Sequence, residues 1–207
     1  SQKFRTSIED EHWLGKAFMG EALVDVIWGA GNWLAPVDRK WIDRSRPATV
    51  FGIPVRMAPP EDLIWFKSYV AGRERFDGAD ICHTILAVGR EMDWSHLLDR
   101  FGEDWELLVS YLMLFRFVYP GDRDIVPDDV LHGLLARVER QIEDGPGEPG
   151  VTRGPMMDRF SYHWDVVTRG YIDPREQCAA NQGYGPHGVA RERAWAERQI
   201  QGTSDVA

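Results

Sequence analysis

Two groups of charged side chains in this sequence have residue types and spacings that could do chemistry. The first is a single carboxylate, Asp25, inside the apolar run Leu23-Val24-Asp25-Val26-Ile27-Trp28. A carboxylate buried in such a strand needs a cation, a hydrogen-bond donor or a metal ion, because burying it bare is very unfavourable. On a strand with one solvated face, the same residue simply points to water. Asp25 is therefore a candidate metal ligand, with a solvent-facing position as the alternative.

The second group is a corner between two predicted helices, formed by Lys67, Arg73, Arg75, Asp77 and Asp80. Cations at such a corner can bind the oxygens of a triphosphate, and an acid there can contact a metal ion or the substrate. A purely structural interpretation is also open. Asp77 has the position and type of a helix N-cap, Asp80 falls in the first turn of that helix, and Lys67 suits a solvated helix face.

The elements that would position these residues change character near residue 60. Before it, segments rich in aromatic and β-branched residues predict strands, and Pro54 in the last of them indicates an edge strand or a bulged pair. From Pro60 onward, apolar residues recur at steps of three and four, which predicts helices. The predicted strands are Phe4–Ile8, His12–Met19, Ala22–Trp28 and Val50–Met57; helices are predicted from Pro60, from Asp77, and over Trp94–Phe101, Trp105–Tyr119, Asp128–Ile142, Pro155–Val167 and Val189–Gln201.

This pattern predicts an α+β protein, in which a small mixed or antiparallel sheet packs against a mainly helical body. We divide the chain into a sheet region (1–58), a helical body (59–142), a linker (143–150) and C-terminal helices with a tail (151–207). The linker is assigned because residues 143–150 contain three glycines and two prolines.

The composition excludes several classes of protein. The 207 residues are 43% apolar, which is ample for a core and excludes disorder of the whole chain. The net charge of -9 repels phosphate backbones, so nucleic acid is not an indicated partner. Two distant cysteines and the lack of a long apolar run predict no disulfide framework, no membrane partner and a cytoplasmic location. Walker loops, dinucleotide fingerprints and the common hydrolase motifs are also absent from the sequence.

With these residues in hand, the stretch from His12 to Tyr171 resembles bacterial members of the nucleotidyltransferase superfamily, which share a polymerase-beta-like catalytic fold. The resemblance lies in a set of short motifs spread along that stretch. They are His12-Trp13-Leu14-Gly15-Lys16-Ala17, Val24-Asp25-Val26-Ile27, Gly31-Asn32 with Ala35-Pro36-Val37-Asp38, Gly52-Ile53-Pro54-Val55-Arg56, Pro60-Glu61-Asp62-Leu63-Ile64-Trp65 with Lys67, and Arg73-Glu74-Arg75-Phe76-Asp77-Gly78-Ala79-Asp80.

The resemblance implies metal-dependent transfer of a nucleotide from a nucleoside triphosphate to an acceptor whose identity the sequence does not indicate. Asp25 resembles the third carboxylate of the family's site for Mg²⁺ or Mn²⁺, so the resemblance makes it both catalytic and metal-binding. Lys67, Arg73, Arg75 and Asp77 would bind the nucleotide. In the family, an Asp-x-Asp pair after a Gly-Gly or Gly-Ser turn supplies the other two carboxylates, several tens of residues before the third. Only 24 residues precede Asp25 here, and they contain no such motif.

Three interpretations follow. The sequence represents a shortened form of a family enzyme, inactive alone; or a degenerate member that binds a nucleotide or partner without transfer chemistry; or an interaction module. In the last case, a sheet edge left without its neighbouring strand favours pairing with a partner or with a second copy of the chain.

Overall fold

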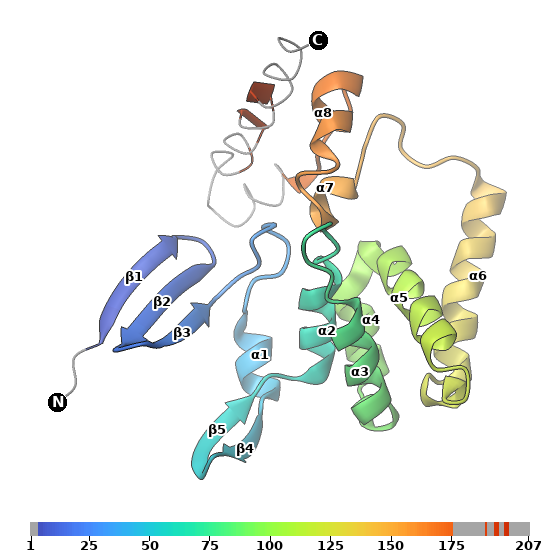
Figure 1. Cartoon of the computed structure of the whole chain (residues 1–207). Helices are drawn as coiled ribbons and strands as arrows, with labels where there is room; N and C mark the ends of the chain where they lie inside the picture. Colours follow the sequence, from blue (N-terminus) through green and yellow to red (C-terminus); the bar gives the residue numbers. More distant parts are fainter. Residues whose placement is uncertain (1–3, 176–188, 190–192, 195–196, 199–207) are drawn as a thin grey trace. The chain divides into compact units, whose positions relative to one another are not determined.

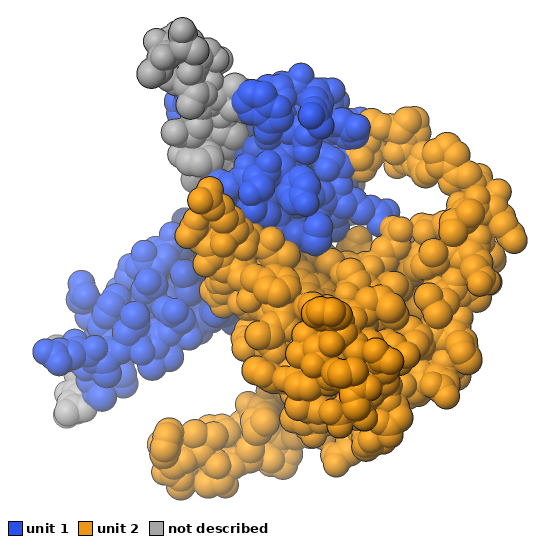
Figure 2. Space-filling view, turned by 45° about the vertical axis from the view of Figure 1, so that its right-hand side comes forward, with its two compact units in different colours: residues 1–40, 152–207 blue, residues 41–151 orange. Residues whose placement is uncertain are grey.

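The computed structural model describes residues 4–175, 189, 193–194 and 197–198. Figure 1 shows its helices and strands. The chain divides into two compact units (Figure 2), which we describe separately. Unit 1 contains residues 1–40 and 152–207, and unit 2 contains residues 41–151. This division differs from the one that the sequence suggested, because the segment after the linker groups with the first 40 residues rather than standing apart. The short helix α1 (Arg39–Arg44) spans the boundary.

Unit 1 begins with a three-stranded antiparallel sheet in the order β1-β2-β3. Its strands are β1 (Arg5–Asp10), β2 (Leu14–Met19) and β3 (Ala22–Ile27). Gly20, with a φ of +59°, helps to form the tight turn that joins β2 to β3. The register pairs Lys16 with Asp25, so these two side chains lie opposite each other on one face. All six residues of β3 are exposed, although most of them are apolar.

The C-terminal part of unit 1 contains two short helices, α7 (Gly154–Met157) and α8 (His163–Arg169). Arg175 follows them and is fully buried, and its guanidinium lies 2.7 Å from the carboxylate of Asp173. The guanidinium also lies 3.4 Å from Nε2 of His163 on α8. A buried guanidinium needs such a partner, because an uncompensated charge in the interior is strongly destabilising. The contact with His163 connects the segment after α8 to that helix.

Unit 2 begins with a separate β-hairpin made of β4 (Arg46–Val50) and β5 (Ile53–Met57). Phe51 and Gly52 form its two-residue turn with φ values of +50° and +78°, the pattern of a type I′ turn. The pairing is regular from Arg46–Met57 to Val50–Ile53, without a bulge. Pro47 and Pro54 fall at positions whose N–H groups would point away from the partner strand, so neither removes a bond from the ladder. The edge-strand alternative predicted from Pro54 is thus the one observed.

The rest of unit 2 is a helical body whose core is formed by side chains from α2, α3, α4, α5 and α6. The helices of this body are α2 (Pro60–Ser68), α3 (Gly78–Val88), α4 (Trp94–Phe101), α5 (Trp105–Val118) and α6 (Asp128–Asp144). Seven apolar side chains in it have no exposed surface: Ile64, Ile81, Ile85, Leu97, Leu108, Leu112 and Phe115. They recur at helical steps along their elements, which is why the apolar periodicity of the sequence predicted these helices.

A buried polar cluster joins the start of α2 to α4. The carboxylate of Asp62 lies 2.5 Å from the guanidinium of Arg100 and 3.1 Å from Nε2 of His96. The preceding acid, Glu61, accepts a hydrogen bond of 2.7 Å from the backbone N–H of Asp93, the residue that caps α4. Glu61 and Asp62 lie in the first turn of α2, where acids complement the helix dipole. In the structure they also bind the neighbouring helix.

The α+β class predicted from the sequence is confirmed, although the described strands form two sheets rather than one. The predicted helix over Pro155–Val167 is interrupted, because the carboxylate of Asp158 accepts the backbone N–H groups of Phe160 and Ser161 and forms a turn. Most of the helix predicted over Val189–Gln201 lies outside the described residues. Within the described part of the chain, no helix has the length and apolar character that a membrane span requires.

Candidate functional site at the α2–α3 corner

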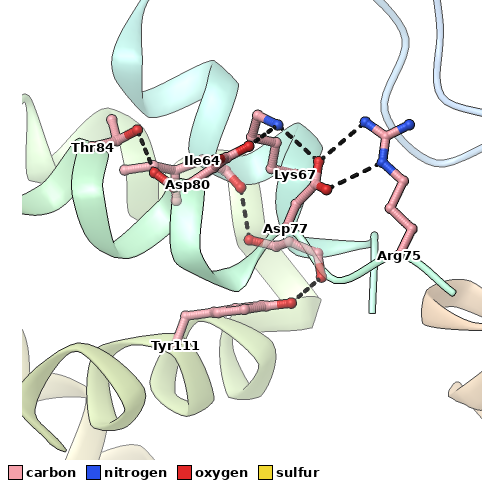
Figure 3. A network of polar contacts seen from close by, with 8 residues as sticks. Ile64, Lys67, Arg75, Asp77, Asp80, Thr84 and Tyr111 are labelled. Carbon is pink, nitrogen blue, oxygen red and sulfur yellow. Dashed lines mark hydrogen bonds and ion pairs between the residues drawn. The ribbon is translucent and has the colours of Figure 1, made fainter. Parts of the chain in front are cut away.

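The side chain of Lys67 lies between two carboxylates where α2 ends and α3 begins (Figure 3). Its ammonium nitrogen is 2.8 Å from Oδ2 of Asp77 and 2.7 Å from Oδ2 of Asp80. Asp77 immediately precedes α3 and Asp80 lies in its first turn. Because residues three apart share one face of a helix, both carboxylates point back toward α2. We call Lys67, Arg75, Asp77 and Asp80 the Lys67 cluster.

Asp77 does not act as a helix cap. It occupies the N-cap position of α3, but its side chain makes no capping hydrogen bond and its backbone, with φ -88° and ψ 13°, is not extended. Its two oxygens instead accept from Lys67 and from Arg75, whose Nε lies 3.2 Å from Oδ1. The interpretation of Asp77 as a simple N-cap is therefore wrong. Two cations bind the carboxylate in place of a backbone N–H, each through a charge-assisted hydrogen bond.

Burial and charge fix the protonation states in this cluster. Partial burial lowers the pKa of Lys67, but the hydrogen bonds and charges of Asp77 and Asp80 outweigh it, so the net pKa lies above its ordinary value. For Asp77 the effects have the opposite signs. Burial raises the pKa of its carboxyl, but the hydrogen bonds and charges of Lys67 and Arg75 outweigh burial, so the net pKa lies below its ordinary value. Lys67 is thus an ammonium and Asp77 a carboxylate at neutral pH, which suits neither of them to proton transfer.

The two arginines predicted for this site occupy different positions in it. The side chain of Arg75 is 74% exposed although it contacts Asp77, so part of its guanidinium faces solvent and can bind an anion. Arg73 is 89% exposed and lies 3.7 Å from the equally exposed Glu74. The structure therefore brings Lys67, Arg75 and Asp77 together with Asp80, and leaves Arg73 beside them as a separate surface charge.

Asp25 lies in unit 1, on the exposed strand β3, opposite Lys16. Nothing in the described part of the chain gives its carboxylate an ion pair or a hydrogen bond, not even the facing lysine. The solvent-facing alternative fits this geometry. Its role as a metal ligand stays a prediction from the family resemblance.

The described residues do not fit the metal site that the resemblance implies. Among them, no group of three or more His, Cys, Asp or Glu side chains could hold a metal ion. A nucleotidyl-transfer site needs several carboxylates that converge on one point, because two cations must be held close together. The exposed position of Asp25 and the pairing of Asp77 with Lys67 and Arg75 explain why neither acid provides such a point here.

Two features of the site were not foreseen from the sequence. One is the direct contact of Asp80 with Lys67; the spacing of Asp77 and Asp80 by three residues was its only signal. The other is Tyr111 on α5, drawn below the cluster in Figure 3, which donates a hydrogen bond to the carbonyl of Ser68. Ser68 and Tyr111 are 43 residues apart, so no local pattern could connect them.

Comparisons with protein-family models, with curated proteins and with solved structures found no match to this chain.

Proposed function

We propose that this chain is a nucleotidyltransferase-like protein that binds a nucleoside triphosphate at the Lys67 cluster, and that the described residues do not carry out transfer by themselves. The observation that supports this function is the position of the Lys67 ammonium, 2.8 Å from a carboxylate oxygen of Asp77 and 2.7 Å from one of Asp80. All three residues belong to the motifs that carry the family resemblance. The proposed location is the cytoplasm, as the cysteine usage of the sequence predicts. The acceptor of the nucleotide is left open.

The three cations at this corner have distinct proposed roles. Arg75 contacts the phosphate oxygens, because its guanidinium is mostly exposed and can form paired hydrogen bonds with them. Lys67 is already bound by two carboxylates, so it holds α2 and α3 together and orients Asp77. Arg73, near the same corner, adds positive potential that attracts the anion. Because no group of carboxylates among the described residues could hold metal ions, this arrangement supports binding rather than transfer.

A thermal-shift screen tests this function. The purified chain is heated with ATP, GTP, CTP or UTP, each with Mg²⁺, and with inorganic triphosphate as a control for the phosphates alone. We expect at least one nucleoside triphosphate to raise the melting temperature, because a ligand that binds only the folded state stabilises it. If none of the four raises it at millimolar concentration, the proposed function fails.

A second candidate function, a catalytically degenerate interaction module, is favoured by the exposed strand β3. This strand is an edge of its sheet, and its four large apolar side chains are between 44% and 59% exposed. The opposite edge, β1, carries Arg5, Glu9 and Asp10, which protect it from pairing. We propose that β3 accepts an antiparallel strand from a second copy of the chain, because β3 has few charges to repel its own sequence.

A further inference from the structure

Tyr111 on α5 fixes the end of α2 immediately beyond Lys67. Its side chain is buried, with 3% of its surface exposed, and its hydroxyl donates a hydrogen bond of 2.9 Å to the backbone carbonyl of Ser68. Ser68 is the last residue of α2, so this carbonyl has no partner within the helix. The hydroxyl therefore supplies the hydrogen bond that the helix cannot, and it holds the residue that follows Lys67 (Figure 3).

The ring of Tyr111 also contacts the side chain of the residue that precedes Asp77. It stacks with the ring of Phe76, with centroids 6.3 Å apart and planes 18° apart. The ring of Phe76 in turn packs so closely on Gly78 that a Cβ at that glycine would lie 2.1 Å from it. Phe76 and Gly78 are the two neighbours of Asp77 in the sequence. One buried tyrosine thus contacts the segment after Lys67 and the segment before Asp77.

We propose that Tyr111 is the positioning residue that sets Lys67 against Asp77. Its hydroxyl fixes the end of α2, its ring fixes the start of α3, and the distance between the ammonium and the carboxylate follows from both. Burial, together with the charges of Asp77 and Cys82, raises the pKa of Tyr111 to about 12, so its hydroxyl stays protonated and keeps donating. That this positioning shapes a nucleotide site rests on the proposed function. The positioning of Lys67 against Asp77 can itself be measured without a nucleotide.

The decisive variant is Tyr111→Phe, which keeps the ring and removes the hydroxyl. The matched control is Tyr119→Phe, the same change at the end of the same helix, where the ring packs against Phe115. In each background, the coupling free energy between Lys67 and Asp77 is measured by a double-mutant cycle with Lys67→Met and Asp77→Asn. The titration midpoint of the Asp77 carboxyl is followed by NMR.

In the Tyr111→Phe background we expect the coupling to fall by about twofold or more. The midpoint of Asp77 should rise toward its ordinary value of 3.8, because Lys67 is no longer held beside it. Tyr119→Phe should change neither quantity. Phe76→Leu, which removes the stacked ring and leaves the hydroxyl, should lower the coupling as well. Wild-type values of coupling and midpoint in Tyr111→Phe would overturn the proposal, whatever Phe76→Leu gives.

The same variants separate this inference from the proposed function. If Tyr111→Phe weakens the coupling while the wild-type protein binds no nucleotide, the positioning role stands and the proposed function fails. If the wild-type protein binds a nucleotide and Tyr111→Phe changes neither the coupling nor the midpoint, the proposed function stands and the positioning role fails.

Discussion

The ammonium nitrogen of Lys67 lies 2.8 Å from a carboxylate oxygen of Asp77, ten residues further along the chain. The side chains are only 20% and 10% exposed, so water competes little for either charge. This pair joins the end of one helix to the start of the next. It therefore links the stability of the α2–α3 corner to the shape of the candidate site.

The pair should contribute measurably to stability. We expect a double-mutant cycle with Lys67→Met and Asp77→Asn, measured by urea unfolding, to give a coupling of about 1–2 kcal/mol, between the values typical of surface ion pairs and of buried charged hydrogen bonds. The matched control is Arg90 and Asp124, which also lie 2.8 Å apart but are 61% and 70% exposed. That pair should couple more weakly. Equal coupling in the two cycles would mean that burial does not strengthen the Lys67 pair.

Stability should depend on pH through both members of the pair. The folded-state pKa of Asp77 is lowered, so its contribution is complete above the ordinary value of 3.8 and is lost as pH falls through the folded-state pKa. The folded-state pKa of Lys67 is raised, so its contribution is complete below 10.5 and is lost as pH rises through the folded-state pKa. Urea unfolding across this range should show a flatter pH dependence for the Lys67→Met, Asp77→Asn double variant. An identical profile in the wild type and the double variant would contradict these shifts.

Replacing Asp25 by asparagine should leave the fold intact. The side chain is exposed on β3, and surface substitutions usually change the free energy of unfolding by less than about 0.5 kcal/mol. If the family resemblance holds for this residue, the wild-type protein should show a thermal shift with Mn²⁺ that Asp25→Asn abolishes. A manganese shift of equal size in both proteins would remove Asp25 from the metal site.

Pairing through the β3 edge can be tested by placing a proline where the backbone N–H points away from the sheet, as Pro47 and Pro54 are placed in the β4–β5 hairpin. Trp28 donates to the carbonyl of Trp13, and the alternation of an antiparallel ladder then points the N–H of Leu23 outward. Leu23→Pro should therefore prevent strand addition without breaking the β2–β3 ladder. In sedimentation velocity, we expect the wild-type chain to self-associate at high concentration and Leu23→Pro to do so less.

Thr6→Pro is the control for this test, because it makes the same change at an outward position of the charged strand β1. It should associate like the wild type. If Leu23→Pro associates as strongly as Thr6→Pro, or if the wild-type chain stays monomeric at all concentrations, β3 is not the surface through which two copies pair.

Local sequence signals predicted much of the fold. The helix over Trp94–Phe101 has the predicted limits, because an N-cap acid before it and a glycine after it coincide with a strong apolar stripe. The six-residue helix α1 was missed, since it buries none of its side chains and so leaves no apolar pattern. The break at Asp158 was also missed, because its side chain competes with the backbone for hydrogen bonds in a way that periodicity does not record.

The candidate site was only partly predictable. The residue types of Lys67, Arg75 and Asp77 and their place at a helical corner could be read locally. Whether Asp77 caps its own helix or binds Lys67 depends on how closely α2 and α3 approach, which is set by tertiary packing. The contribution of Tyr111 depends on α5, whose place in the helical body no local sequence pattern specifies.

The measurement that tests the central claim most directly is isothermal titration of the chain with the nucleoside triphosphate that gives the largest thermal shift. Arg75→Gln removes the exposed cation of the Lys67 cluster, and Arg90→Gln is the matched control at another exposed arginine paired with an aspartate. We expect Arg75→Gln to weaken binding by about tenfold, the loss of one charged hydrogen bond, and Arg90→Gln to bind like the wild type. Equal affinity in all three proteins would place the nucleotide elsewhere and contradict the proposed site.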